Sequence, residues 1–394
     1  MNDIFLEKYT GCKYHCITSF GRTALYLLIK TLKLEGKEIL IPAFICNSVI
    51  DAILKAGARP VFVDVNILDL SLNLNDARQK ITSASAAILF VHYFGFVYPD
   101  INNLKEFTQK NHLFLIEDCS QSLGAWHQGK RVGSIGDASI FSFTKNTLAF
   151  GGGAIGTNNE TLFKQIKVEI SNEDKINNKL WRRFYKFIVT SVYYYKLCVD
   201  KMIYDRPNRS IFKWWLINIP DYCLKPLVFF KNLFVSTKNN SENNSSLALS
   251  KDSFLDMNII PLSLTIYSIR KQLRKLDENN KSRMAIIQIL KRKILYLYYN
   301  INSKSEDINV GTFLPLQIQN RDIGKLISQL KKQGLLLRET WPAFQTCMIN
   351  HTTENISFLA STLLLLEINP YLTEQEINKI AFFYFLKYNV LCLK

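Results

Sequence analysis

The chain has 394 residues, of which 48% are hydrophobic and 21% are charged. This balance is typical of a globular protein of two or three domains with a large core, not of a disordered chain. Lysine and arginine number 49 against 33 acidic residues, so the net charge is +16, which attracts anionic partners of every kind without choosing among them.

Residues 20–170 alternate short apolar runs with amphipathic stretches. Apolar residues at helical spacing predict helices at 21–34, 48–58, 74–81 and 101–111. Short, bounded apolar runs predict strands at 38–44, 60–65, 86–95, 113–118 and 138–143, and a glycine-rich turn leads into one more at 151–157. Strands that alternate with helices indicate an α/β fold with a mostly parallel sheet.

Polar and charged residues fall where these strands end. His92 lies near the end of one strand, Glu117 and Asp118 close the next, and Ser142 lies near the end of a third. Because ligands of parallel sheets bind at the C-terminal ends of the strands, we expect these positions to serve a ligand rather than packing. Glu117 alternates to the side opposite Asp118 and is expected to be structural.

Residues 175–250 break the pattern with a basic, aromatic-rich insertion. From Lys179 to Lys238 there are 12 Lys or Arg residues against three Asp residues. The longest uncharged run has nine residues, far short of the roughly 20 that a membrane-spanning helix needs. One interpretation is a membrane-surface platform, with Trp214 and Trp215 at the level of the lipid headgroups. The other is a subdomain that packs on the large domain or lines the substrate entrance. The polar run 236–246 is interpreted as a flexible linker.

From about residue 253 helices and strands resume. The expected elements are a long helical stretch at 264–301, a strand at 312–318, and helices at 321–334 and 372–385. Thr373 and Glu376 have the spacing of a capping box at the start of the last helix. We therefore expect a large domain over 1–252, including the insertion, and a smaller C-terminal α+β domain over 253–394.

The cysteines and the N-terminus bear on the cellular compartment. Cys12 and Cys16 have C-x₃-C spacing, but no second close pair exists among the eight cysteines, so no zinc site or other metal centre is expected. Free, buried thiols in a reducing compartment are expected instead. The first residues, MNDIFLEKYTG, carry acids where a signal peptide needs a basic start and an apolar run. The expected location is the cytoplasm, with membrane association through 179–238 left open.

Four motifs then combine into a specific pattern. They are GRTAL at 21–25, IEDCSQSLGA at 116–125, FSFTKN at 141–146 and GGGA at 151–154. Together with ILIPAF, VHYFG, LKKQGL and NPYLTEQEI, the pattern extends over most of the chain, and it resembles the DegT/DnrJ/EryC1/StrS family of sugar aminotransferases. The resemblance implies the PLP-dependent transferase fold of type I, with helices on both faces of a mostly parallel central sheet and a smaller C-terminal α+β domain. It also implies pyridoxal 5′-phosphate (PLP) as the cofactor.

The resemblance implies catalytic roles for three residues. Lys145, the only lysine between Lys130 and Lys164, would hold the aldehyde of the cofactor covalently and then move a proton. Asp118 would keep the ring nitrogen protonated; helix capping is the alternative. His92 would lie near the reacting groups, with a hydrogen-bonded strand-end histidine as an equal alternative.

The remaining residues implied by the resemblance bind the cofactor. Gln121 would lie near its phenolic oxygen. Its phosphate would meet the start of the first long helix at Gly21, Arg22 and Thr23, where backbone N–H groups are available, and the hydroxyl of Ser142. Arg22 could equally point to solvent.

The chain departs from the family pattern in three places. Only Thr144 separates FSF from Lys145, where the family has two or three residues, so Thr144 is the alternative phosphate donor to Ser142. The ring-stacking aromatic of the family aligns with Cys46; Phe44, Tyr93 or Phe94, or an aliphatic side chain, is the candidate replacement. The family's N-Y-R segment, which reaches the phosphate of the neighbouring subunit, is not visible before residue 262, although a homodimer is still expected.

These observations predict a PLP-dependent aminotransferase. It would move an amino group, from glutamate, onto a keto-sugar carried on a nucleotide, in the biosynthesis of surface polysaccharide, lipopolysaccharide or a related glycan; nucleic acid is not an expected partner. One alternative is a sugar dehydratase or lyase of the same fold, which the retained Lys145 disfavours because such relatives carry histidine there. The other is a non-catalytic member that acts as a binding or scaffold protein.

Overall fold

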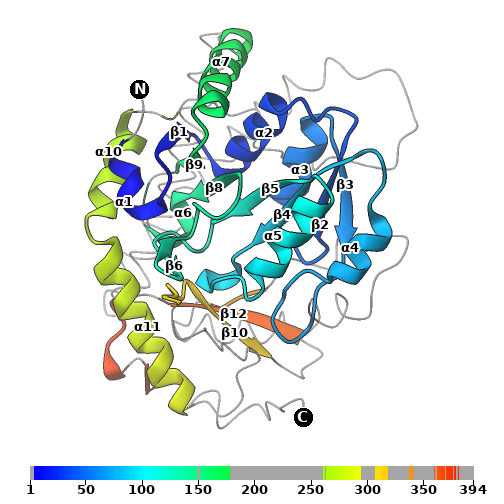
Figure 1. The fold of residues 1–394 in the computed structure, drawn as a ribbon. Coiled ribbons are helices and arrows are strands. Elements are labelled where there is room, and N and C mark those ends of the chain that lie inside the picture. Colours follow the sequence, from blue (N-terminus) through cyan, green and yellow to red (C-terminus); the bar gives the residue numbers. More distant parts are fainter. Residues whose placement is uncertain are drawn as a thin grey trace, which may run out of the picture. The chain divides into compact units, whose positions relative to one another are not determined.

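The structure of the chain is a computed structural model (Figure 1). It describes residues 4–147, 149, 151–177, 261, 263–293, 307–317, 337–339, 359, 362–368, 370–375, 377–378 and 380. Apart from Asn177, these residues fall in one compact unit, formed by Met1–Ile176 and Ile259–Lys394. Beyond its first residues, the predicted insertion at 175–250 lies outside the described residues, as do the linker at 236–246 and the helix expected at 321–334. The division of the chain at 252 stays a prediction.

A seven-stranded sheet forms the centre of this unit, in the order β1-β9-β8-β5-β4-β2-β3. Its strands are β1 (Tyr14–Thr18), β2 (Glu38–Pro42), β3 (Arg59–Val63), β4 (Ser85–Val91), β5 (Phe114–Asp118), β8 (Ala138–Ser142) and β9 (Gly153–Thr157). Strands β2, β3, β4, β5 and β8 are parallel, and β9 runs antiparallel to both of its neighbours, so β1 runs in the direction of β8. The mostly parallel sheet predicted from the sequence is confirmed.

Helices cover both faces of the sheet, and the sheet separates two clusters of buried hydrophobic residues. The helices of the first 177 residues are η1 (Ile4–Leu6), α1 (Glu7–Thr10), α2 (Gly21–Thr31), α3 (Asn47–Lys55), α4 (Leu74–Lys80), η2 (Tyr93–Gly95), α5 (Ile101–Lys110), α6 (Phe143–Asn146) and α7 (Glu160–Asn177). One cluster holds residues of α2 and α3, and the other holds residues of α4 and α5. Successive strand residues alternate between them, since Ile116 belongs to the first and Leu115 to the second. The sheet is therefore buried on both faces, which is why its strands read as continuous apolar runs.

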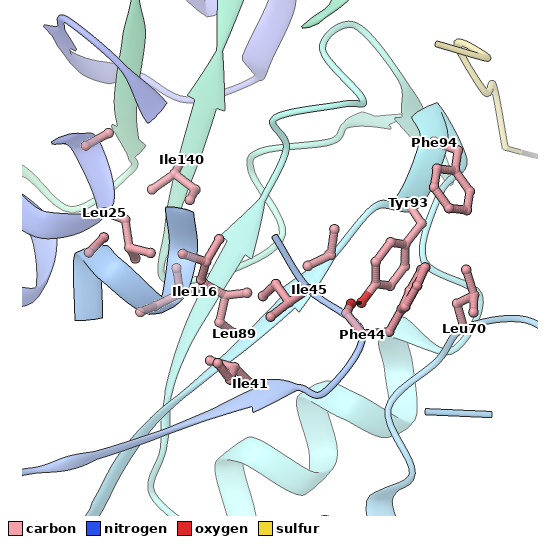
Figure 2. Packing of buried hydrophobic residues seen from close by; sticks show 14 of the residues in the cluster. Leu25, Ile41, Phe44, Ile45, Leu70, Leu89, Tyr93, Phe94, Ile116 and Ile140 are labelled. Carbon is pink, nitrogen blue, oxygen red and sulfur yellow. Dashed lines mark hydrogen bonds between the residues drawn. The ribbon is translucent and has the colours of Figure 1, made fainter. Parts of the chain in front are cut away.

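Figure 2 shows the first cluster from close by. Side chains of Ile41, Leu89, Ile116 and Ile140 come from neighbouring strands and belong to the same cluster as Leu25 of α2. Burial of side chains of this size contributes about 1.5–3 kcal/mol each, and this packing fixes the strand ends from which the site is built.

The C-terminal part adds two helices and a second sheet. The elements are α10 (Ser263–Leu273), α11 (Leu276–Lys293), β10 (Phe313–Gln317), β11 (Leu337–Glu339) and β12 (Leu363–Glu367). The three strands form an antiparallel sheet in the order β10-β12-β11. Residues 374–375, 377–378 and 380 are helical, and the amide of Ile377 donates to the carbonyl of Thr373, so the last predicted helix begins where the sequence indicated. No described helix has the length and apolar character needed to cross a membrane.

Several elements differ from the sequence-based expectation, for example α7 and β12, which were not expected. Strand β1 was not expected. The strand expected at 86–95 ends at Val91, because Phe94 and Gly95 have left-handed backbones with φ of 60° and 92°. The helical stretch expected at 264–301 is two helices, α10 and α11, broken at 274–275, and its described part ends at Lys293.

Candidate active site

The predicted site residues follow strand ends that lie at one edge of the sheet. Strands β1, β2, β4, β5 and β8 run in the same direction, so their C-terminal ends meet there. The residues that follow those ends are Gly21 after β1, Cys46 after β2, His92 after β4, Asp118 and Gln121 at β5, and Ser142 and Lys145 at β8. The topology thus gathers candidates from over 120 residues of sequence at one edge.

Asp118 is the last residue of β5 and is 6% exposed. Its Oδ1 accepts a 2.8 Å hydrogen bond from the amide of Ser120. Burial raises the pKa of Asp118, while the bonds from Ser120 and the charges of His92 and Lys145 oppose that rise. A buried carboxylate with so little compensation is destabilising unless a cation joins it.

Lys145 lies in the single helical turn α6 and is partly exposed. Its amine is near enough to Asp118 for its charge to lower the pKa of that carboxyl. No hydrogen bond or ion pair joins its side chain to another residue in the described ranges. An amine in this position is available to react with a bound aldehyde.

Gln121 is held by its oxygen and keeps its amide donors for another group. The Oε1 atom accepts a 2.7 Å bond from the amide of Phe94 in η2. Among the described residues its Nε2 has no hydrogen-bond partner, and the side chain is 7% exposed. Because the oxygen is fixed, the NH₂ group is oriented as a donor, as an anionic phenolic oxygen would require.

The start of α2 forms a narrow cradle against β8 and β9. A Cβ atom at Gly21 would lie 3.1 Å from the carbonyl oxygen of Phe141, 3.3 Å from Cβ of Ser142 and 3.5 Å from Oγ of Ser120. At Gly153, which pairs with both Thr18 and Ser142, a Cβ atom would lie 2.4 Å from the amide nitrogen of Gly21. Hydroxyls and the N-terminus of α2 therefore come together, and such a terminus favours an anion.

The other residues predicted near the phosphate lie around this cradle. The hydroxyl of Thr23 is 3.4 Å from that of Ser19, and the guanidinium of Arg22 lies 5.1 Å from the ring centre of Phe20. The hydroxyls of Ser142 and Thr144 are 3.1 Å apart, so the two alternative phosphate donors lie next to each other.

His92 and Glu117 form a buried pair beside Asp118. The Nε2 of His92 is 3.0 Å from Oε1 of Glu117, and its Nδ1 accepts a 2.9 Å bond from the amide of Tyr98. Both ring nitrogens are therefore occupied, as in the hydrogen-bonded alternative for this histidine. A catalytic role for His92 stays a prediction.

Glu117 anchors the loop that follows the hairpin of β6 (Trp126–His127) and β7 (Lys130–Arg131). Its two oxygens accept from the amides of Gly133, Ile135 and Gly136 at 2.6–2.9 Å, besides the bond to His92. Burial alone would raise the pKa of Glu117, but these donors outweigh it and hold that pKa below its usual value. The expectation that Glu117 is structural agrees with this geometry.

One group of potential metal ligands lies in the same place. Nitrogen, oxygen and sulfur atoms of His92, Glu117 and Cys119 lie within 4.8 Å of one another, all buried. Both oxygens of Glu117 are already taken by four donors, and burial raises the pKa of the Cys119 thiol well above its usual value. This group is a hydrogen-bonded anchor, because the oxygens of Glu117 are occupied and the thiol of Cys119 resists the deprotonation that a metal ligand needs.

Cys46 is the residue that the sequence predicts at the ring-stacking position. Cys46 precedes α3, and its Sγ lies 3.1 Å from the hydroxyl of Ser48. Phe44, Tyr93 and Phe94 pack on one another in the core, and the hydroxyl of Tyr93 donates to the carbonyl of Phe44 (Figure 2). These three rings are at most 3% exposed.

Several residues of the site were not singled out from the sequence. Ser120 contacts Asp118, while Asn146, Arg283 and Thr312 hold the turn that carries Lys145. Ser120 could have been found from the sequence, because it lies in the motif IEDCSQSLGA two residues after Asp118. Arg283 and Thr312 are more than 130 residues from Asn146, and no local pattern joins them.

Solved structures define the class of fold. An aminotransferase of the DegT DnrJ EryC1 StrS type from Brucella abortus matches 96% of this chain and 86% of its own chain, with a TM-score of 0.65 and 19% identity. The fold is thus that of the PLP-dependent transferases of fold type I, as the sequence predicted.

The sequence match points to the same family. The model of the DegT/DnrJ/EryC1/StrS aminotransferase family matches residues 5–193, so this part of the chain is similar to that family. The GDP-perosamine synthase of Escherichia coli O157:H7 is 37% identical over 155 residues, which are 38% of this chain and 42% of that protein. The dTDP-3-amino-3,6-dideoxy-alpha-D-galactopyranose transaminase of Aneurinibacillus thermoaerophilus is 39% identical over 164 residues, 41% of this chain and 45% of that protein. The chain matches less than half the length of each of these relatives.

Proposed function

We propose that this chain is a PLP-dependent aminotransferase that moves an amino group, from glutamate, onto a nucleotide-linked keto-sugar for the synthesis of a surface polysaccharide or related glycan. The observation that carries the proposal is the placement of Lys145 near Asp118. Lys145 follows β8, and Asp118 ends the neighbouring parallel strand β5. The charge of Lys145 lowers the pKa of Asp118. An amine and a buried carboxylate so arranged suit the two ends of one small aromatic cofactor.

The residues present fit PLP on three counts. Asp118 is a buried carboxylate whose raised pKa reflects an unfilled need for a cation, which a protonated ring nitrogen supplies. Gln121 is oriented as a donor, which suits the phenolic oxygen. Gly21 and Ser142 belong to the cradle at the N-terminus of α2, where a Cβ atom at the glycine would be crowded and where a phosphate is favoured.

Each residue then has a definite task. When bound, PLP supplies an electron sink for the carbon that loses or gains the amino group. Asp118 would keep a proton on the ring nitrogen. Lys145 would hold the cofactor, and its freed amine would carry a proton to and from the reacting carbon. Gln121 would donate to the phenolic oxygen, and Ser142, Thr144 and the start of α2 would hold the phosphate.

The substrate class is supported by the relatives. The two curated relatives described above bear names that refer to GDP- and dTDP-linked amino sugars. The net charge of +16 suits a substrate that carries a diphosphate. A homodimer is part of this proposal. Peripheral membrane contact through 179–238 is the least supported part, because that segment lies outside the described residues.

A cofactor-loading experiment tests the proposal. The purified full chain is incubated with PLP, its visible absorbance is recorded, and borohydride reduction followed by peptide mapping locates the attached cofactor. Attachment at Lys145 is expected, with loss of the band in Lys145→Ala and its retention in the matched variant Lys130→Ala, which changes an exposed lysine of β7. A wild-type protein that stays colourless would instead favour a binding or scaffold role.

Addition of substrates then tests the reaction. Glutamate is expected to bleach the visible band, and a panel of GDP-, UDP- and dTDP-linked keto-sugars to restore it. Restoration by one sugar identifies the substrate. Release of a dehydrated sugar without consumption of glutamate would favour the dehydratase or lyase alternative. Sedimentation of the same preparation gives the oligomeric state.

A further inference from the structure

Arg283 of α11 reaches the residue that follows Lys145. Its Nη2 donates a 2.8 Å hydrogen bond to the main-chain carbonyl of Asn146. The guanidinium also donates to Oδ1 of Asn280 at 2.8 Å and to the carbonyl of Ile368 at 3.2 Å. Arg283 is 6% exposed, and burial lowers its pKa to about 10. An arginine that divides its donors among three acceptors in the interior is a fixed connector rather than a surface charge.

Thr312 holds the side chain of the same residue. The Nδ2 atom of Asn146 donates to Oγ1 of Thr312 at 2.6 Å and to the carbonyl of Gln121 at 3.1 Å. The hydroxyl of Thr312 in turn donates to that carbonyl at 2.6 Å. Asn146, Thr312 and Gln121 therefore form a closed triangle of hydrogen bonds, buried to at least nine-tenths at every corner.

The turn α6 depends on such outside contacts. It has four residues, Phe143–Asn146, and a helix of one turn is too short to be stable by itself. Asn146 is its last residue. Arg283 holds the main-chain carbonyl of Asn146 and Thr312 holds its side-chain amide, so these two contacts determine where the turn ends. Lys145 immediately precedes that point.

We propose that Arg283 and Thr312 are positioning residues, which hold Asn146 from the main-chain and the side-chain sides and thereby fix the direction of Lys145 in the site. This inference rests on the proposed function for its consequence in catalysis. The same triangle holds the main-chain carbonyl of Gln121, so the backbone positions that carry the amine and the amide donor are fixed by one cluster. The C-terminal part of the chain therefore completes the half of the site that carries Lys145.

The first test needs no cofactor and uses the full chain. Amide hydrogen exchange is measured over 143–147 in the wild type, Arg283→Lys and Thr312→Val, with Lys281→Met as the control because Lys281 is exposed on the same helix. Exchange over 143–147 is expected to accelerate at least about tenfold in both test variants and not in the control, while 101–110 in α5 stays unchanged. Unchanged exchange over 143–147 in a folded Thr312→Val or Arg283→Lys overturns the proposal. So does faster exchange that spreads equally through α5, because the residues would then support the fold at large.

The second test uses the PLP-loaded protein. A misdirected Lys145 is expected to lower kcat by about 10–100-fold while the KM for the amino donor changes less than about threefold. The pH at which the visible band of the bound cofactor shifts is also expected to move, and a change in general stability alone would not move it. Normal kcat and an unshifted pH midpoint in both variants overturn the proposal. A wild type that takes up no PLP defeats the proposed function, whereas the exchange result still decides whether these residues hold α6.

Discussion

Glu117 and Asp118 are consecutive carboxylates at the end of β5 whose pKa values move in opposite directions. Both are buried. Because strand residues alternate between faces, Glu117 meets four donors, and these outweigh burial and lower its pKa. Asp118 accepts from the amide and the side chain of Ser120, and burial outweighs these bonds and raises its pKa. One carboxylate is satisfied by the fold, and the other is left for a ligand.

Replacement of Asp118 by asparagine is expected to separate stability from function. The raised folded-state pKa means that the carboxyl favours folding while it is protonated, below its unfolded value of 3.8, and that this contribution is lost as pH rises through the folded pKa. At pH 7 the cofactor-free Asp118→Asn variant should therefore be as stable as the wild type, or more stable by about 0.5–2 kcal/mol. Urea unfolding of both cofactor-free proteins measures this.

The same variant should lose activity once PLP is added. Asparagine cannot hold a proton on the ring nitrogen by charge, so kcat is expected to fall at least about 100-fold. Asp118→Glu retains the charge and serves as the matched control for chemistry. A cofactor-free Asp118→Asn protein that is clearly less stable than wild type would contradict the reasoning.

Glu117→Gln is expected to destabilise the fold in a pH-dependent way. Glutamine keeps one acceptor oxygen for four donors and leaves buried N–H groups unsatisfied, at a cost of about 1–3 kcal/mol for each. The pKa of Glu117 is lowered from about 4.5, so its contribution is present above that value and is lost as pH falls through the folded pKa. Thermal melts from pH 7 to pH 3 should converge for variant and wild type at the acid end, and parallel curves would disprove this.

Gly153→Ala tests the close approach of β9 to α2. The new Cβ atom would lie 2.3 Å from the carbonyl carbon of Phe20 and 2.4 Å from the amide nitrogen of Gly21, and both are backbone atoms. We expect a loss of about 1–3 kcal/mol or more in unfolding free energy, and weaker phosphate binding. Gly129→Ala is the control. It has open space but a φ of +75°, so only about 1 kcal/mol of backbone strain is expected there.

Gln121→Glu tests the orientation of the amide. The new carboxylate can still accept the bond from the amide of Phe94, so the melting temperature should change little. It offers no donor to a phenolic oxygen and adds a negative charge, so the affinity for PLP should fall at least about tenfold. Absorbance titration with PLP measures this, with the exposed Gln109→Glu as the charge control. Equal affinities in all three proteins would show that Gln121 does not face the cofactor.

The local sequence pattern predicted the positions where the strands end. It therefore predicted that Asp118, Ser142 and Lys145 lie at one edge of the sheet. It missed β1, whose buried residues include His15 and Thr18, because their polarity does not read as an apolar run. The pattern predicted α10 and α11 as one helix, because apolar residues continue at helical spacing through the break at 274–275. It could not pair Arg283 or Thr312 with Asn146, since hydrogen bonds between such distant residues depend on the tertiary fold and leave no periodic signal.

The position of β9 between β1 and β8 has a consequence for how the chain is made. Strand β1 is the first of the sheet to leave the ribosome, yet its partner Gly153 is about 135 residues later. At roughly 5–20 residues per second, β1 waits about 7–27 s for its neighbour. The start of α2 follows β1 closely, so the proposed phosphate site is completed only when β9 arrives, whereas the strands that carry His92 and Asp118 can pair during that interval.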